Sequence, residues 1–166
     1  MIVINEAKKL VTYCGGFCGA CGMYKGRIWA MVAQDFKEII EVTGFAEWVP
    51  KFEKIDFNFS DFLKGLEYFA NERTGPYCKF PCKEGGGPPC KVRPCAKERG
   101  IEICFECKDF PCEHFAWILK NHPDKLEDCE RFKKIGLEGW IKFNLERVEK
   151  GYASGTHKYY SQAKKE

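Results

Sequence analysis

The cysteines constrain this chain more than any other feature, because ten of the eleven fall into two dense groups. The first group is the glycine-flanked segment Cys14-Gly-Gly-Phe-Cys18-Gly-Ala-Cys21. The second lies between residues 75 and 112, where prolines and glycines are frequent and aliphatic side chains are few. Its seven thiols belong to Cys78, Cys82, Cys90, Cys95, Cys104, Cys107 and Cys112. Such a stretch cannot build a hydrophobic core of its own, so the sequence predicts that its sulfur atoms are tied together.

The sulfur atoms could be tied by disulfides or by metal ions, and the composition favours metal. An odd number of cysteines does not fit a complete disulfide framework. The opening residues, MIVINEAKKL, lack the apolar stretch of a signal peptide, so we expect a cytoplasmic protein, in which thiols stay reduced. Disulfides are kept as the alternative, because they occur inside hyperthermophiles and this chain is rich in lysine and poor in glutamine.

Two cysteine pairs have the spacing of zinc ligands. Zinc takes four ligands in a tetrahedron, and two cysteines separated by two residues can both reach one ion. Cys18 and Cys21 form such a pair, as do Cys104 and Cys107, and each pair has a third thiol nearby. Glycines around the first pair let backbone N–H groups turn toward the sulfurs. These spacings predict bound metal, and one structural zinc site can supply on the order of 10 kcal/mol of folding free energy.

We expect two or more zinc ions, and an iron–sulfur cluster is the alternative, because four thiolates suit either. The spacing Cys14-x3-Cys18-x2-Cys21 also occurs in radical S-adenosylmethionine enzymes. Those proteins usually carry an aromatic residue where this chain has Ala20, and they need alternating strands and helices that this sequence does not show. The sequence therefore gives no support for radical chemistry.

Apolar residues at helical spacing lie on both sides of the cysteine-rich stretch. Residues 28–40 form one stripe, and a second helix is expected to start at a Ser60 N-cap. Residues 137–148 form the clearest stripe, and a short helix is expected over 92–99. The tail from Tyr152 onward is polar and is expected to be loose.

These patterns predict a mainly α-helical chain with a loop-rich, metal-stabilised, zinc-ribbon-like module, which makes a small fold of helices and irregular segments. We expect residues 1–166 to form a single domain. Residues 11–25 and 75–114 would build the cysteine-rich module. This module would pack on helices from residues 26–72 and 111–151.

Several single residues have simple structural interpretations. Cys129 lies on an amphipathic stripe and is expected to be a buried, inert thiol. The tryptophans on helical stripes are expected in the core: Trp29, Trp117 and Trp140. The three histidines are expected to be exposed or to contact helix ends: His114, His122 and His157. His114 could instead complete a metal site, because it follows Cys112 closely. Nothing singles out one thiol as a nucleophile, so no catalytic residue is expected.

The cysteine motifs follow one another in a specific order. Tyr13-Cys-Gly-Gly-Phe-Cys-Gly-Ala-Cys21 is followed by Cys90 and Arg93-Pro-Cys-Ala-Lys-Glu-Arg-Gly-Ile101, then by Cys104-Phe-Glu-Cys107 and Asp109-Phe-Pro-Cys-Glu113. Over residues 11–120 this order resembles an uncharacterised prokaryotic family, domain of unknown function 3795, whose members are described as cysteine-rich candidates for zinc binding. The chain departs from the family at Cys78-x3-Cys82, where a C-x2-C pair is usual, and it lacks the final cysteine pair of some members.

The resemblance implies that ten cysteines act together as metal ligands: Cys14, Cys18, Cys21, Cys78, Cys82, Cys90, Cys95, Cys104, Cys107 and Cys112. Ten thiols do not divide evenly into sites of four, so two would be left over unless sulfurs bridge ions or a third site forms. One ion is expected to bind the last four of these cysteines. The other is expected to bind the first three together with one thiol from residues 78–90. The family brings no known reaction.

Charge gives little guidance about partners. The formal net charge is +3, and eight metal-bound thiolates would make the balance slightly negative, so a nucleic-acid partner is unsupported. No apolar run approaches the ~20 residues that a membrane span needs. We expect a non-catalytic structural zinc protein that presents a surface to another macromolecule, most simply a protein. The alternatives are an iron–sulfur redox or electron-transfer protein and a zinc-ribbon-like nucleic-acid-binding module.

Overall fold

The computed structural model describes residues 4–52, 55–73, 75 and 77–161, and within them the chain is mainly helical, as the sequence predicts. The α-helices are α1 (Ile4–Lys8), α2 (Trp29–Val42), α3 (Phe45–Trp48), α4 (Phe59–Ala70), α5 (Val92–Glu98), α6 (Ala116–Asn121) and α7 (Lys125–Glu149). Short 3-10 turns lie between them: η1 (Cys18–Ala20), η2 (Val49–Lys51), η3 (Cys82–Glu84), η4 (Cys104–Glu106) and η5 (Glu113–Phe115). An antiparallel hairpin pairs β1 (Tyr152–Ala153) with β2 (Lys158–Tyr159). None of the helices in these ranges is long and apolar enough to cross a membrane.

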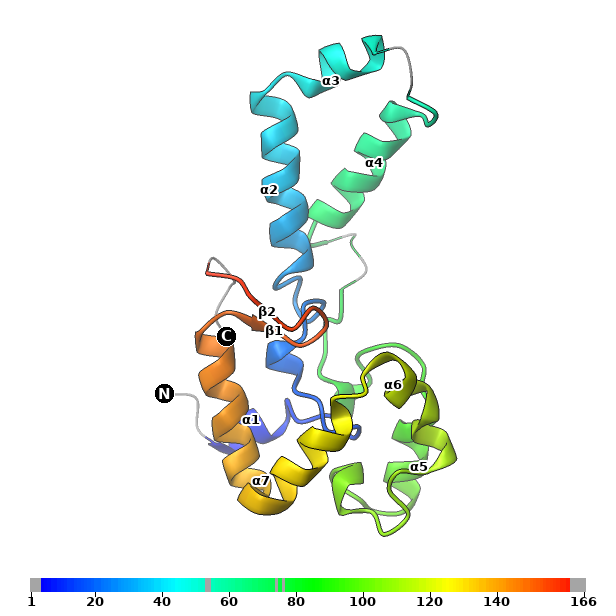
Figure 1. Ribbon diagram of the computed structural model, residues 1–166, viewed down its shortest axis with the longest axis vertical. Helices are drawn as coiled ribbons and strands as arrows, with labels where there is room; N and C mark the ends of the chain where they lie inside the picture. Colours follow the sequence, from blue (N-terminus) through cyan, green and yellow to red (C-terminus); the bar gives the residue numbers. More distant parts are fainter. Residues whose placement is uncertain (1–3, 53–54, 74, 76, 162–166) are drawn as a thin grey trace.

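Helices α2, α3 and α4 form an arm that projects from the rest of the molecule (Figure 1). We call the described residues between 29 and 70 the arm, and the remainder of the described chain the body. In the arm, α2 and α4 pack against each other. Helix α4 begins after an Asn58 N-cap, whose side-chain oxygen accepts a hydrogen bond from the Asp61 N–H at 3.1 Å. The predicted Ser60 cap is therefore wrong, and Ser60 lies inside the helix.

The predicted apolar stripe along α2 is helical, but most of it is not covered. Ile28 and Ile40 are buried, whereas Trp29 is 41% exposed. Trp117 on α6 is also exposed, so two of the three tryptophans expected in the core lie at the surface. Trp140, the third, is buried as predicted. The arm helices thus form where their periodicity predicts. Several of their apolar side chains stay partly exposed, including Trp29 and Phe36, whose rings contact Phe69 and Phe62 of α4 along one edge.

Helix α7 organises the core of the body. Trp140 on this helix is 1% exposed, and Phe105 from the cysteine-rich stretch packs against it with ring centroids 6.1 Å apart. Ile103 from the same stretch is fully buried in this core, together with Phe115 and Ile141. The cysteine-rich stretch therefore contributes its apolar side chains to a core that it shares with α7.

A bend at Gly136 divides α7 into two halves. The backbone of Gly136 leaves helical geometry there, with φ 67° and ψ −177°, a conformation that suits glycine because it has no Cβ. Figure 1 shows the two halves at an angle. The bend lets Phe132 on the first half and Trp140 on the second share one core, with their rings in edge contact at 6.5 Å. Cys129 on the first half is buried, as predicted.

The described part of the C-terminal segment, residues 152–161, forms a hairpin whose first strand packs on the body, in contrast to the loose tail that its polarity predicts; residues 162–166 of that tail lie outside the described residues. Tyr152 and Ala153 on β1 are buried. The buried Arg27 donates hydrogen bonds to the carbonyl oxygens of Tyr152 at 2.7 Å and Val148 at 3.3 Å. This guanidinium ties the hairpin to the end of α7, and polarity alone does not reveal such a partner.

Candidate metal centre

The two C-x2-C pairs adopt the same backbone conformation. In each, the N–H of the second cysteine bonds to the C=O of the first, at 2.9 Å for Cys21 and Cys18 and at 3.0 Å for Cys107 and Cys104. An extended residue precedes each turn, and the second cysteines have nearly identical dihedral angles (φ −75° and ψ 127°; φ −74° and ψ 131°). The local structure therefore repeats even though the intervening residues differ.

The backbone around Tyr13 joins the two cysteine segments. The Tyr13 C=O accepts a hydrogen bond from the Cys104 N–H at 2.7 Å, and the backbone of Tyr13 also bonds to the sulfur of Cys82. The Phe105 ring lies directly over Gly15, where an added Cβ would come within 2.1 Å of the ring. Gly15 therefore allows the second C-x2-C turn to dock on the first segment.

Four thiols gather beside the first C-x2-C turn, and we call them the first thiol cluster: Cys18, Cys21, Cys78 and Cys82. The Cys82 N–H donates to the sulfur of Cys18 at 3.3 Å, and the sulfur of Cys21 accepts backbone hydrogen bonds from Met23 and Tyr24. Burial raises the pKa of Cys18 to about 12, and repulsion from the other three thiolates adds to the shift. These thiols are therefore close enough for their charges to interact.

Four other thiols gather beside the second turn, and we call them the second thiol cluster: Cys95, Cys104, Cys107 and Cys112. Burial raises the pKa of Cys104 to about 12, and repulsion from the thiolate of Cys14, followed by those of the other three, adds to the shift. Arg99 lies at the edge of this cluster, with its Nη1 atom 3.6 Å from the sulfur of Cys107 and an ion pair to Asp109. These are the four cysteines expected to share one ion. Their charges interact, but no three of their sulfurs lie within 4.8 Å of one another, so the shared ion stays a prediction.

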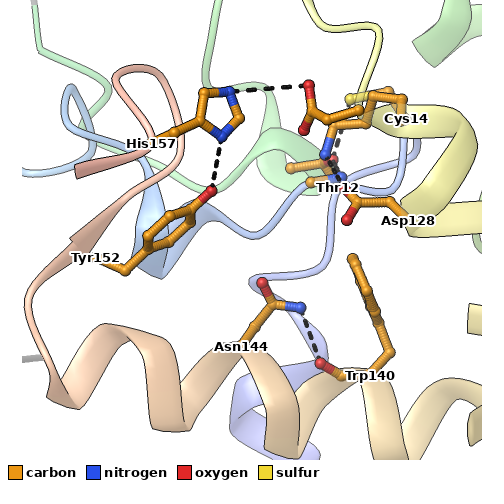
Figure 2. A network of polar contacts seen from close by, with 10 residues as sticks. Thr12, Cys14, Asp128, Trp140, Asn144, Tyr152 and His157 are labelled. Carbon is orange, nitrogen blue, oxygen red and sulfur yellow. Dashed lines mark hydrogen bonds and ion pairs between the residues drawn. The ribbon is translucent and has the colours of Figure 1, made fainter. Parts of the chain in front are cut away.

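Cys14 and Cys90 stand outside these two clusters. The charge of Cys14 raises the pKa of both Cys82 and Cys104, after the larger effect of burial, so Cys14 lies between the clusters. Its sulfur is 3.2 Å from the hydroxyl of Thr12 (Figure 2). The sequence groups Cys14 with Cys18 and Cys21, but the thiolates that act on Cys18 are those of the first thiol cluster.

A cavity of about 260 Å³ opens beside the first thiol cluster. Six thiols line it: Cys14, Cys18, Cys21, Cys78, Cys82 and Cys90. The loop at one side is held by Arg93, whose guanidinium donates to the carbonyl oxygens of Gly85, Gly86 and Pro88. Gly86 is required in this loop because an added Cβ would lie 1.7 Å from the carbonyl oxygen of Phe80. Sequence reasoning did not assign a role to Arg93, Arg99 or Thr12.

No three of the cysteine sulfurs lie as close together as the ligands of a single zinc ion. With Zn–S near ~2.3 Å, four sulfurs around one zinc would lie about 3.8 Å from one another. Among the described residues, which include every cysteine, no three cysteine sulfurs come within 4.8 Å of one another. All of these cysteines are free thiols in the structure. A single ion would therefore draw each cluster together, whereas a larger group would need less movement.

A comparison with family models places the chain in a family. The model described as "Protein of unknown function (DUF3795)" matches residues 10–117, which is more than half of the chain. The chain therefore belongs to this family, and the matched range contains all ten clustered cysteines and both C-x2-C turns. Comparisons with curated proteins and with solved structures give no match.

Proposed function

We propose that this member of the DUF3795 family is a non-catalytic metal-binding protein, in which thiolate-bound zinc fixes the base of the arm and the arm binds a protein partner. The observation that carries the proposal is a row of exposed apolar side chains along α2: Trp29, Val32, Phe36, Ile39 and Val42. They recur every three or four residues, so they follow one face of the helix. Contiguous apolar patches on a protein surface mark sites of interaction.

The charge of the arm favours a protein over a nucleic acid as the partner. Acidic residues outnumber basic ones in residues 26–72. Lys37 and Lys64, two of the arm cations, are already paired with carboxylates of the arm. Nucleic acid would be repelled by this balance, because phosphate binding relies on unpaired lysine and arginine. The apolar row with an acidic surround suits a protein surface that is apolar at its centre and basic at its rim.

The first thiol cluster lies where both ends of the arm join the body. Cys21 precedes α2 and Cys78 follows α4 in the sequence. The Cys78 N–H donates to the Met23 C=O at 3.1 Å, and the Lys25 N–H donates to the Cys78 C=O at 3.0 Å. A cation bound by Cys21 and Cys78 together would fasten these two segments and so hold the base of the arm.

The donor set fits a structural zinc site. Four thiolates around zinc leave no coordination position for water, which is why we infer a structural and not a catalytic role. The hydrogen bonds from backbone N–H groups to the sulfurs of Cys18, Cys21 and Cys82 would stabilise thiolates, as outer-sphere donors do in metal sites. Cys18, Cys21, Cys78 and Cys82 would hold one ion, and Cys95, Cys104, Cys107 and Cys112 a second.

Metal analysis and site-specific crosslinking test the two halves of the proposal. Protein purified without added metal should contain about two zinc ions per chain. A photoreactive amino acid at Val42, which is 80% exposed, should crosslink a partner protein, and Ile39→Asp should abolish that crosslink. The same amino acid at Leu126, an exposed apolar residue on α7, is the matched control. Equal crosslinking from both positions would contradict a binding role for the arm, and crosslinking only between copies of the chain would assign the row to self-association.

The cavity beside the first thiol cluster favours an iron–sulfur cluster as the second candidate. It is lined by six thiols, and no three of their sulfurs are as close as one zinc ion requires. In that case the protein would have a redox or electron-transfer role. Anaerobically purified protein would then show broad visible absorption and contain iron, whereas zinc has a filled d shell and is colourless.

A further inference from the structure

A second group of side chains of the types that bind metals lies in the body, and it contains no cysteine. His122 follows α6, Asp124 precedes α7, and His157 lies in the turn between β1 and β2. One ligand atom from each lies within 4.8 Å of the other two. Elsewhere in the described ranges, no three histidine, cysteine or acidic side chains meet this closely.

The carboxylate of Asp124 has an oxygen that lacks a hydrogen-bond partner. This Oδ1 atom is shielded from solvent. It lies 3.8 Å from Nε2 of His157, which is too far for a hydrogen bond. A shielded carboxylate oxygen without a donor is costly, because it has lost its hydration without replacement. A cation between Asp124 and His157 would satisfy this oxygen and would suit the distance between two ligands of one ion.

The other nitrogen of His157 is held by Tyr152. Its Nδ1 atom lies 3.0 Å from the Tyr152 hydroxyl, and Figure 2 shows the imidazole between this hydroxyl and a carboxylate. When Nδ1 donates to the hydroxyl, the lone pair of Nε2 is directed toward Asp124. Histidines that bind metals are typically oriented in this way by a partner on their second nitrogen. Tyr152 is itself fixed, because its ring is buried and the Arg147 guanidinium stacks on it at 3.3 Å.

We propose that His122, Asp124 and His157 form a binding site for a divalent first-row transition metal ion, with zinc as the ion to test. Two imidazoles and one carboxylate suit zinc, iron, nickel and copper better than magnesium or calcium, which prefer oxygen ligands. Three protein ligands leave a coordination position for water. The site connects the α6–α7 junction to the C-terminal hairpin, so bound metal would fasten the hairpin to the body. It contains no cysteine, but His122 and Asp124 line the same cavity as the six thiols beside the first thiol cluster, so the thiols must be saturated with metal before this site is tested.

Histidine-labelled protein gives a direct readout, because the chain has only three histidines. The full chain, with its thiols first saturated with zinc, would be titrated with further Zn²⁺ while the imidazole signals are recorded by NMR. The signals of His122 and His157 should move together with one midpoint, whereas that of His114 in η5 should not follow this transition. The proposal is overturned when His157 does not respond, or when all three histidines respond with the same midpoint, as in unspecific binding.

Four variants separate binding from folding. His157→Asn removes the imidazole but keeps a residue type that tolerates the positive φ of 53° at this position, and it should abolish the transition. Asp124→Asn should weaken zinc binding at least about 10-fold, and Tyr152→Phe should weaken it about 10- to 100-fold while preserving the packing of the ring. His114→Asn is the control and should bind as the unmodified chain does. Wild-type affinity in both His157→Asn and Asp124→Asn, with unchanged helical circular dichroism, would refute the site.

Discussion

Replacing Phe105 with alanine should destabilise the protein by about 3–5 kcal/mol, the range for removing a large aromatic side chain from a packed core. Phe105 is 4% exposed, and its ring contacts those of Phe110, Phe132 and Trp140 at centroid distances of 5.4, 5.8 and 6.1 Å. The cavity left by alanine would be bounded by these rings, which belong to different segments and cannot all move inward. This decrease is a large part of the free energy of unfolding of a typical domain, which is about 5–15 kcal/mol.

Equilibrium unfolding in urea, with the metal content held constant, measures this loss. Tryptophan fluorescence would report on the core through Trp140, and a metal indicator would report release from the thiols. Phe80→Ala is the matched control, since Phe80 lies in the same stretch but is 60% exposed, and it should change stability by no more than about 0.5 kcal/mol. If Phe105→Ala lowered the free energy of unfolding by less than about 1 kcal/mol, the cysteine-rich stretch would not depend on the core that it shares with α7.

Three further predictions concern the metal and the backbone. Hydrogen exchange at residues 23–28, where the arm joins the body, should become faster when the metal is chelated or when Cys78 is replaced by serine. Cys129→Ser, at a buried thiol outside the clusters, is the control and should not affect this segment selectively. Zinc affinity, measured by competition with a chelator between pH 6 and 8, should rise with pH. Burial raises the pKa of Cys18 and Cys104 to about 12, so binding must displace their protons, with up to about four released per ion. Gly136→Ala should lower the free energy of unfolding by about 1–2 kcal/mol, because alanine is strained at the positive φ of this position. Gly65→Ala in α4 should raise it by about 0.5–1 kcal/mol, because an added Cβ there meets nothing within 4 Å. Urea unfolding measures both changes.

Periodicity predicts where helices form, but it does not reveal what covers them. Both α2 and α7 carry apolar residues at helical spacing, yet Trp140 is buried and Trp29 is exposed. The difference arises because the cysteine-rich stretch supplies Phe105 and Ile103 to the core around α7, whereas Trp29 on α2 is covered in part by the Phe69 ring of α4. The start of α4 shows the same limit at a smaller scale. Asn58 and Ser60 are both good N-cap residues, and only the backbone direction after Asn58 decides between them.

The spacing of the cysteines identifies candidate ligands but does not group them. Cys14 is close to Cys18 in the sequence, and the sequence therefore places both at one ion. In the structure a turn intervenes, in which the Thr12 N–H bonds to the Gly16 C=O at 2.9 Å, and Cys14 lies between the two clusters. The pairing of Asp124 with His157 is even less accessible, because it depends on the hairpin after α7. Contacts between segments that are distant in the sequence leave no local pattern to read.

The positions of the two thiol clusters imply that their metals would have different effects. The second thiol cluster flanks Phe105, so a cation there would support the same core as α7, and its loss would add to the cost of unfolding the body. The first thiol cluster lies at the base of the arm, and Phe17 and Ala20 beside Cys18 belong to the main core. Loss of a cation there would loosen the arm first, because Met23, Lys25 and Cys78 join the arm to the body at this point. Occupancy of the first thiol cluster would therefore control how the apolar row on α2 is presented to a partner, and occupancy of the second would control whether the body is folded.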